Sequence, residues 1–214
     1  MDIVWNNLGA FLQGASVTVR ISAVAVCFGL IIGSIFGLMR ISGSVILRSI
    51  AGVYVEAIRG TPLMVQLLYI YFGLPQIGVI LPPFTAAAIA LSINSGAYVA
   101  EIVRAGIQSI DKGQMESARS LGMTYMQAMR YIILPQAFRR IIPPLVNEFI
   151  MLIKDSSLLS VIGVIELTRT GQRISGATYN VFHVFTAVAV IYFIMTFSLS
   201  KFMGYLERRW QIND

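Results

Sequence analysis

The stretch ISAVAVCFGLIIGSIFGLM, residues 21–39, decides the class of fold because it contains no charged side chain. Arg20 and Arg40 bracket it on either side. An uncharged apolar run of about 20 residues is long enough to cross the roughly 30 Å hydrocarbon layer of a membrane as one helix. The stretch therefore predicts a membrane span.

The composition extends this prediction to the whole chain. Of the 214 residues, 57% are hydrophobic and 12% are charged, whereas ordinary globular chains carry about 25% charged residues. The N-terminal segment MDIVWNNLGAF lacks the basic start of a signal peptide, so we expect the first span to be retained. The single cysteine, Cys27, lies in an apolar run and predicts neither an intrachain disulfide nor a metal cluster.

Further apolar stretches predict four more spans. The uncharged stretch from residue 60 to residue 100 is too long for one helix, and the segment GLPQIGVILPP, residues 73–83, divides it with its Gly and Pro residues. The four spans are expected near residues 54–73, 84–105, 141–153 (a short apolar core) and 174–200. The predicted fold is all-α, a polytopic membrane protein with five transmembrane helices.

The positive charges predict the orientation in the membrane. Lys and Arg collect on the cytoplasmic side of membrane proteins, and here they gather between spans one and two, between spans three and four, and in the tail. We therefore expect the N-terminus outside and the C-terminus in the cytoplasm. Lys154, Arg169 and Arg173, in the connection after span four, are exceptions. Because these loops account for the net charge of +6, no nucleic-acid partner is expected.

The segment ESARSLGMTYMQAMRYIILP, residues 116–135, is a predicted cytoplasmic loop with the pattern of a helix. Its apolar positions recur at steps of three or four, which predicts one narrow apolar stripe: Met115, Ala118, Leu121, Gly122, Met126 and Met129. Gly122 indicates a bend or a close backbone approach, and Pro135 indicates a helix restart. Two interpretations stay open: an amphipathic helix on the inner membrane surface, or a short helix pair in a groove of a soluble partner.

The same segment resembles the EAA loop of ABC-importer permeases. The matching pattern is Glu-x-Ala, three residues, Gly, nine residues, and Ile-x-Leu-Pro; Ser117 stands where alanine is commoner. Three other stretches resemble the polar amino acid subgroup of these permeases: RGTPLMVQLLYIYFGLP (59–75), AYVAEIVRAGIQSIDKGQ (97–114) and IKDSSLLSVIGV (153–164). The likeness runs from about residue 12 to the tail.

This resemblance implies one transmembrane permease domain, residues 1–214, in the inner (plasma) membrane of a prokaryote. It implies coupling helices between spans three and four that dock on a cytoplasmic ATPase, with coupling residues Glu116, Ala118, Arg119, Gly122, Leu134 and Pro135. The chain lacks the phosphate loop G-x-x-x-x-G-K followed by Ser or Thr. ATP and magnesium are therefore expected on the partner, with no cofactor or metal on this chain and no enzymatic activity of its own. The expected partners are two ATP-binding subunits, a second permease (another copy or a close relative) and an extracytoplasmic amino-acid-binding protein.

Polar residues at membrane depth are the candidate substrate site, because they are costly there unless they serve a function. Asn94 lies halfway along span three, and Tyr98 follows one turn later. The alternative for Asn94 is a hydrogen bond that joins two helices. Glu101 and Arg104, three residues apart, are expected to form a structural ion pair. Thr61-Pro62 is expected at the start of a helix.

Span four supplies the remaining candidates. Its short core, ending in KDSSL, predicts a broken helix in which Ser156 or Ser157 caps a second short helix. The exposed amides of such a helix end bind a carboxylate well. Glu148 or Asp155 is then expected to meet the ammonium group or the basic side chain of a substrate. The alternative for Asp155 is an ion pair with Lys154.

Together these residues predict a permease subunit of an ATP-driven importer that works by alternating access and carries a polar amino acid. The two acids favour a basic one. The rival prediction is a self-sufficient channel or an ion-gradient-driven amino acid carrier, which needs no ATPase. An intramembrane hydrolase is disfavoured, because His183 with Ser92 or Ser198 is all that the chain offers for a nucleophile and its base.

Overall fold

The computed structural model describes the backbone of residues 2–211 and the side chains of residues 2–205, and within these limits every regular element is a helix. The elements are α1 (Asp2–Asn6), α2 (Leu8–Arg40), α3 (Val45–Arg59), α4 (Leu63–Leu68), η1 (Tyr69–Gly73), η2 (Leu74–Ile77), α5 (Pro83–Gln108), α6 (Lys112–Ser120), α7 (Tyr125–Ala128), η3 (Met129–Ile133), α8 (Leu134–Asp155), η4 (Ser156–Ile162), α9 (Leu167–Thr178) and α10 (Val181–Gln211). The predicted all-α class is confirmed.

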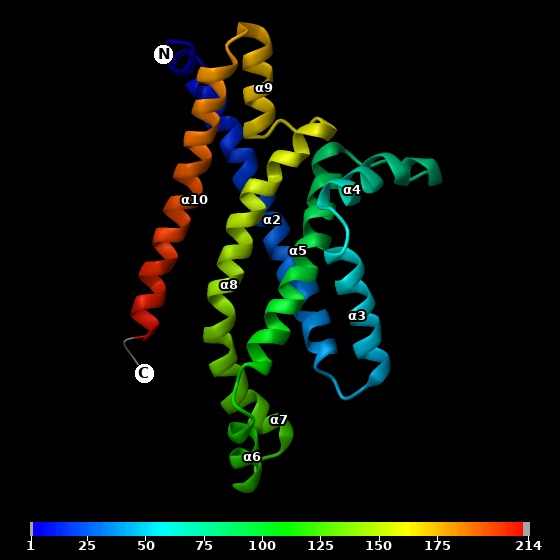
Figure 1. The fold of residues 1–214 in the computed structure, drawn as a ribbon. Coiled ribbons are helices and arrows are strands. Elements are labelled where there is room, and N and C mark those ends of the chain that lie inside the picture. The colour runs from blue at the N-terminus through cyan, green and yellow to red at the C-terminus, as the bar shows by residue number, and fades with distance from the viewer. Residues whose placement is uncertain (1, 212–214) are drawn as a thin grey trace.

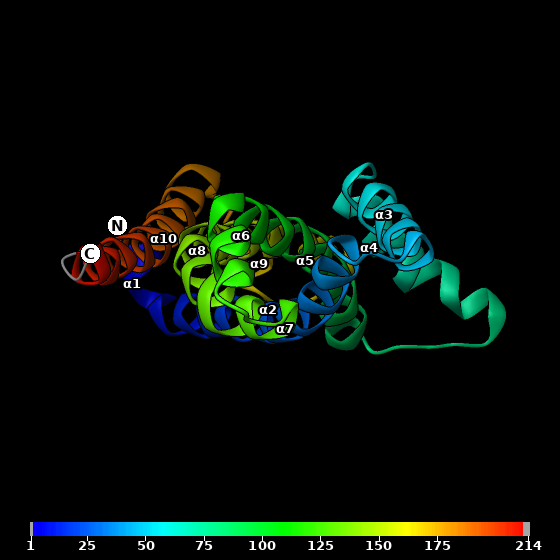
Figure 2. The same cartoon turned by 90° about the horizontal axis from the view of Figure 1, so that it is seen from below.

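The long helices α2, α5, α8 and α10 run along one elongated body, with α9 at one end and α6 and α7 at the other (Figure 1). Seen from below, α6 and α7 lie under the ends of the central helices, with α3 and α4 to one side and α10 to the other (Figure 2). A substrate path and a docking surface can therefore lie at different heights of one helical framework.

Helices α2 and α5 form the centre of the bundle through small residues. Gly29 and Gly37 are buried in their contact, and a Cβ atom built on Gly29 would lie 2.8 Å from the Ser95 hydroxyl oxygen. On α5, a Cβ atom on Gly96 would lie 2.7 Å from a methyl carbon of Ile32. Small residues of this kind let two membrane helices approach closely, where van der Waals contact holds them together.

Three described helices are long and apolar enough to cross a membrane: Leu8–Arg40, Pro83–Gln108 and Val181–Tyr205. The helix at 83–108 agrees with the predicted third span. Helix α8 lies beside these helices but contains two prolines, Pro143 and Pro144, and several charged residues. The number of five spans therefore stays a prediction.

The predicted second span, 54–73, is wrong as a single helix. Helix α3 ends at Arg59, and α4 starts after Pro62. Proline lacks an amide hydrogen, and it pushes the residue before it toward extended backbone, so a helix cannot run through Thr61-Pro62 unchanged. The Gln66 side-chain nitrogen donates to the Ile58 carbonyl at 2.7 Å and to the Thr61 carbonyl at 3.1 Å, which satisfies the freed end of α3.

The predicted fifth span, 174–200, is also divided. Helix α9 ends at Thr178, Tyr179 takes a left-handed backbone conformation with φ 54°, and α10 begins at Val181. A left-handed residue just after the last helical turn is a common way for a helix to end. The Asn180 side-chain oxygen accepts the amide hydrogen of His183 at 3.3 Å, so α10 starts with its own polar contact.

The predicted break in span four does not occur. Helix α8 passes from Asp155 into the tighter turns of η4, which ends at Ile162, before Gly163 with φ 84°. Asp155, not Ser156 or Ser157, precedes η4, and its side chain makes no capping hydrogen bond. The Ser156 amide donates to the carbonyl of Leu152, so it is not a free helix end. A 3₁₀ turn at the end of an α-helix preserves the hydrogen bonds that a break would expose.

Candidate functional site

One cavity of about 410 Å³ collects most of the predicted substrate residues, and we call it the Arg59–Glu148 cavity. It is lined by Arg59, Gly60, Thr61, Pro62, Leu63, Asn94, Tyr98, Glu148, Met151 and Asp155. These residues come from the break between α3 and α4, from α5 and from α8. Asn94, Tyr98, Glu148 and Asp155, far apart in the sequence, are thus brought together, as a shared site requires.

Hydrogen bonds connect the break between α3 and α4 to α5, which lies on the other side of the cavity lining. The Asn94 side-chain nitrogen donates to the Gln66 side-chain oxygen at 3.0 Å. Gln66 in turn donates to the hydroxyl of Thr61 at 2.9 Å. Asn94 therefore makes the interhelical hydrogen bond that was one interpretation of it, and it also lines the cavity that the other interpretation requires.

The two acids of the cavity lie on one face of α8. Glu148 and Asp155 are seven residues apart, close to two helical turns, so their side chains leave the helix in similar directions. Among the described side chains, no ion pair joins Asp155 to Lys154, because the pairs found there both involve Glu101. Asp155 is thus available to the cavity.

Arg59 is the cavity residue that sequence reasoning missed. It is the last residue of α3, and its guanidinium carbon lies 5.3 Å from the centre of the Tyr98 ring. The signal that points to it is the sequence Arg-Gly-Thr-Pro, since the proline break turns the end of α3 toward α5. With Arg59 included, the cavity holds charges of both signs.

Ser156 does not join this group. It is fully buried, and its hydroxyl donates to the carbonyl of Ile153 at 2.8 Å. It does not line the Arg59–Glu148 cavity. The interpretation of Ser156 as a helix cap with free amides is wrong, because α8 continues through this point without opening its backbone.

Glu101 and Arg104 form the predicted structural ion pair. The Arg104 Nε atom donates to Glu101 Oε2 at 3.0 Å, and a second guanidinium nitrogen bonds to the other carboxylate oxygen. Arg40 from α2 lies 3.8 Å from the same carboxylate. The carboxylate is therefore committed to holding α2 and α5 together.

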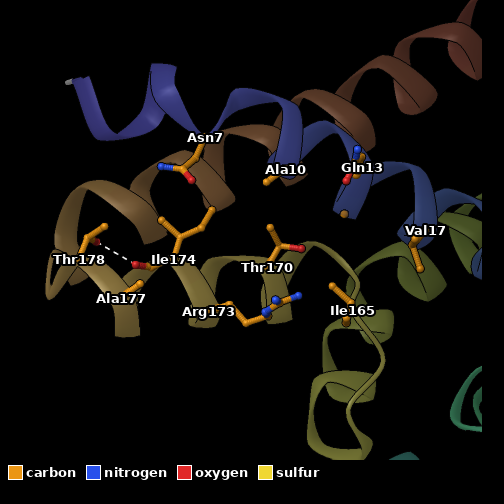
Figure 3. Close-up of a pocket in the computed structure, with 11 residues that line it drawn as sticks. Asn7, Ala10, Gln13, Val17, Ile165, Thr170, Arg173, Ile174, Ala177 and Thr178 are labelled. Atoms are coloured by element: carbon orange, nitrogen blue, oxygen red, sulfur yellow. Dashed lines mark hydrogen bonds between the residues drawn. The ribbon is translucent and has the colours of Figure 1, made fainter.

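A separate cavity of about 520 Å³ lies between α2 and α9 (Figure 3). Asn7 and Gln13 reach it from one side, and Thr170 and Arg173 from the other. Arg173 is its one charged lining residue, and none of the predicted substrate residues lines it. Because it lacks an acid, it is less suited than the Arg59–Glu148 cavity to a ligand with charges of both signs.

The coupling segment, residues 116–135, folds as two short helices around a bend. Helix α6 ends at Ser120, and Gly122 has φ 86° with open space around it, so the predicted bend is confirmed. An Arg119 guanidinium nitrogen donates to the Met123 carbonyl at 3.0 Å across the bend. Thr124 then starts α7 with a capping box that Gln127 completes.

The predicted single apolar stripe is divided by this bend. Ala118 is buried where α6 contacts α7 and η3, whereas Leu121 is 84% exposed and Met126 is 70% exposed. A continuous helix would have placed them along one face, but the left-handed Gly122 turns the chain between them. The outcome is an apolar surface that protrudes at the end of the molecule.

The remaining predicted coupling residues border this surface. The Glu116 side chain is exposed, and so are those of Leu134 and Pro135. Pro135 lies in the first turn of α8, but the predicted helix restart does not occur there, because α7, η3 and α8 follow each other with right-handed helical backbone throughout. The wide turn η3 accommodates the proline, which has no amide hydrogen to donate in the usual helical pattern.

Comparison with known proteins places the chain among transport proteins. Residues 26–212 match the family described as "Binding-protein-dependent transport system inner membrane component". The chain is 44% identical over 211 residues to the glutamine transport system permease protein GlnP of Escherichia coli (strain K12), covering 98% of this chain and 96% of that protein. It is 42% identical over 204 residues to the arginine transport system permease protein ArtQ of Bacillus subtilis (strain 168), covering 95% and 93%.

The fold is similar to that of a solved transporter. A crystal structure of an amino acid ABC transporter with histidines superposes with a TM-score of 0.93 at 48% identity, covering 96% of each chain.

Proposed function

The chain belongs to the family of inner membrane components of binding-protein-dependent transport systems, and from this premise we propose that it is the permease subunit of an ATP-driven importer of a polar amino acid. The observation that carries the proposal is the Arg59–Glu148 cavity, which presents a cation and two acids in one bundle with an exposed coupling segment. An amino acid carries both charges, so a site with both signs suits it.

The coupling segment is the proposed mechanical input. Short helices with exposed apolar side chains at the end of a membrane bundle fit a groove on a soluble partner, and Leu121 and Met126 supply such side chains. Closure of two partner ATPases on ATP and magnesium then moves the bundle as a rigid body, because α8 continues directly from this segment to the cavity. Glu116, Ala118, Arg119, Gly122, Leu134 and Pro135 are the proposed coupling residues.

The full transporter needs three kinds of partner. We infer a cytoplasmic ATP-binding subunit in two copies, a second permease that closes the open side of the path, and an extracytoplasmic binding protein that delivers the amino acid. In this arrangement the coupling segment and the C-terminus face the cytoplasm, and the N-terminus and α9 lie at the outer face.

The substrate proposal rests on the charges of the cavity. Asn94, Tyr98, Glu148 and Asp155 line the path, and the relatives named above transport glutamine and arginine. With two acids against one Arg, the cavity complements a ligand with two positive charges and one negative charge. A basic amino acid such as arginine or lysine has this charge pattern at neutral pH.

The test is reconstitution of this permease with and without its ATPase in sealed vesicles. Uptake of labelled amino acid against a gradient is expected only with the ATPase and ATP, with stimulation by the loaded binding protein. Accumulation driven by a sodium or proton gradient without the ATPase overturns the proposal in favour of an ion-driven carrier.

A further inference from the structure

Arg59 and Tyr98 line a second cavity as well as the first. This Arg59–Arg140 cavity, of about 430 Å³, is lined by Arg59, Tyr98, Glu101, Ile102, Ala105, Gly106, Ser109, Arg140 and Pro144. Its α5 residues follow Tyr98 toward α6, so it lies nearer the coupling segment (Figure 1). The Arg59–Tyr98 pair therefore stands between two cavities that follow each other along α5.

The sign of the charge changes across this pair. The Arg59–Glu148 cavity contains the carboxyl groups of Glu148 and Asp155. The Arg59–Arg140 cavity contains two Arg side chains, and its one acid, Glu101, is already bound by Arg104 and Arg40. A ligand with a positive and a negative end is thus oriented, with its positive end toward α9 and its negative end toward α6.

The guanidinium of Arg59 is free to take a new partner. Among the described side chains no carboxylate lies within 4.0 Å of it, and its contact is the face of the Tyr98 ring. A cation over an aromatic face keeps its N–H donors at the edge of the plane, where they remain available. The planar fork of an Arg matches both oxygens of a carboxylate.

We propose that Arg59 binds the α-carboxylate of the amino acid at the boundary between the two cavities and that Tyr98 positions the guanidinium for this contact. The ammonium group then faces Glu148 and Asp155, and the substrate travels toward the cytoplasm with its carboxylate leading. This inference rests on the proposed function, because it assigns an additional residue to the same path. Arg59 determines specificity here, and Tyr98 is a positioning residue.

The test compares ligands with and without a carboxylate on the purified permease–ATPase complex in lipid nanodiscs, without the binding protein. The probes are L-arginine and L-glutamine, each against its α-carboxamide, with affinity measured by calorimetry. We expect the wild-type complex to bind the better amino acid about tenfold more tightly than its amide, since Arg59 is exposed and the loss of its charge partner costs less than in a fully buried pair. Arg59→Gln is expected to weaken binding of the acid to the level of the amide, so that the ratio falls to about one.

Matched variants separate positioning from folding. Arg48→Gln removes the same charge from an exposed position of the same helix and is expected to leave the ratio unchanged. Tyr98→Phe retains the ring face and is expected to preserve discrimination, whereas Tyr98→Leu removes it and is expected to lower the ratio several-fold. Arg59→Lys retains the charge without the fork and is expected to give an intermediate ratio.

The outcomes distinguish this inference from the proposed function. If the wild-type complex binds an amino acid and Arg59→Gln still prefers the acid to the amide, the role of Arg59 is overturned and the importer proposal stands. If the wild-type complex binds neither amino acid, both the site and the role of Arg59 are overturned. Equal loss of the acid and the amide in Arg59→Gln also overturns the inference, because it indicates a change of shape rather than a lost carboxylate contact.

Discussion

The coupling segment and the Arg59–Glu148 cavity are built in opposite ways. The coupling segment is made from neighbours in the sequence: Asp111 caps α6, Gly122 turns the chain, and Thr124 with Gln127 caps α7. The cavity is made from α3, α5 and α8, joined by long-range contacts such as the Asn94–Gln66 hydrogen bond. A single substitution can therefore disrupt the whole coupling segment, whereas a single substitution in the cavity removes only one of several contacts with a ligand.

This contrast predicts that the largest single effect falls on the coupling segment, at Gly122. Gly122→Asp places a side chain in a left-handed conformation, at a cost of about 1–2 kcal/mol, and adds a charge to an apolar docking surface. Burying an unpaired charge costs several kcal/mol more. We expect ATP-driven uptake in vesicles to fall about 100-fold or more, with membrane insertion and the amount of protein unchanged.

Two variants sharpen that experiment. Gly122→Asn is nearly the same size as Asp and tolerates the left-handed conformation, so its difference from Gly122→Asp isolates the charge. Gly43→Asp adds a charge at another glycine with open space around it, without a left-handed φ, and is expected to leave uptake unchanged. Unimpaired uptake by Gly122→Asp would falsify the coupling role.

The second prediction concerns the acids of the cavity, where the effect is on affinity rather than on coupling. Asp155→Asn or Glu148→Gln removes one half of a charge pair with a bound basic amino acid, which costs about 2–5 kcal/mol, or roughly 30-fold or more in affinity. We expect arginine uptake to suffer far more than glutamine uptake in a competition assay. The same loss for both amino acids indicates that the acids meet only the α-ammonium group. Unchanged affinity and ranking in both variants removes the acids from the site.

The same contrast explains what the sequence revealed in advance. The helix pattern and the bend at Gly122 depend on neighbouring residues, and both were predicted. The restart expected at Pro135 was wrong, because η3 carries the helix directly into α8. Asn94, Tyr98, Glu148 and Asp155, which line one cavity, were singled out because polar groups are rare at membrane depth. Arg59 was missed because a positive charge at a helix end is typical of an anchor at the membrane interface. Only the fold shows that Tyr98 lies beside it.

The errors have physical causes of their own. Hydropathy carries no information about backbone conformation. The prediction from hydropathy therefore joined α3 to α4 across Pro62, and the end of α9 to α10 across Tyr179. The apolar stripe of the coupling segment was read on an unbroken helix, although Gly122 was already recognised as a bend. The expected break at Ser156 followed from the short apolar core of span four. Helix α8 extends instead through polar residues at both ends of that core.

The third prediction is a smaller loss of affinity when the contact between α5 and the break between α3 and α4 is removed. Asn94→Ala removes the hydrogen bond to Gln66, and a net loss of about 1 kcal/mol corresponds to roughly fivefold weaker binding if this contact positions the path. Ser92→Ala is the matched control, because the Ser92 hydroxyl bonds to Ala88 within its own helix. Equal effects of both substitutions on binding indicate general loosening of α5 and contradict a specific role for Asn94.

The smallest effect is expected from a substitution at Ser156. This substitution tests whether the amino acid site consists of side chains alone or also includes the amides of a helix end. The Ser156 hydroxyl bonds to Ile153 one turn earlier, and its amide is already engaged with Leu152. Removing such a back-bonded hydroxyl from a helix changes stability by about 1 kcal/mol or less, because the carbonyl retains its helical partner. We therefore expect Ser156→Ala to leave amino acid affinity unchanged and to shift the thermal midpoint of the purified complex by a few degrees at most. The measurements are calorimetric binding of L-arginine and L-glutamine alongside thermal unfolding, with Asp155→Asn as the reference for a residue that lines the cavity. A loss of affinity in Ser156→Ala comparable to that in Asp155→Asn, without a loss of stability, contradicts this assignment, since it requires η4 to open a free helix end toward the cavity during transport.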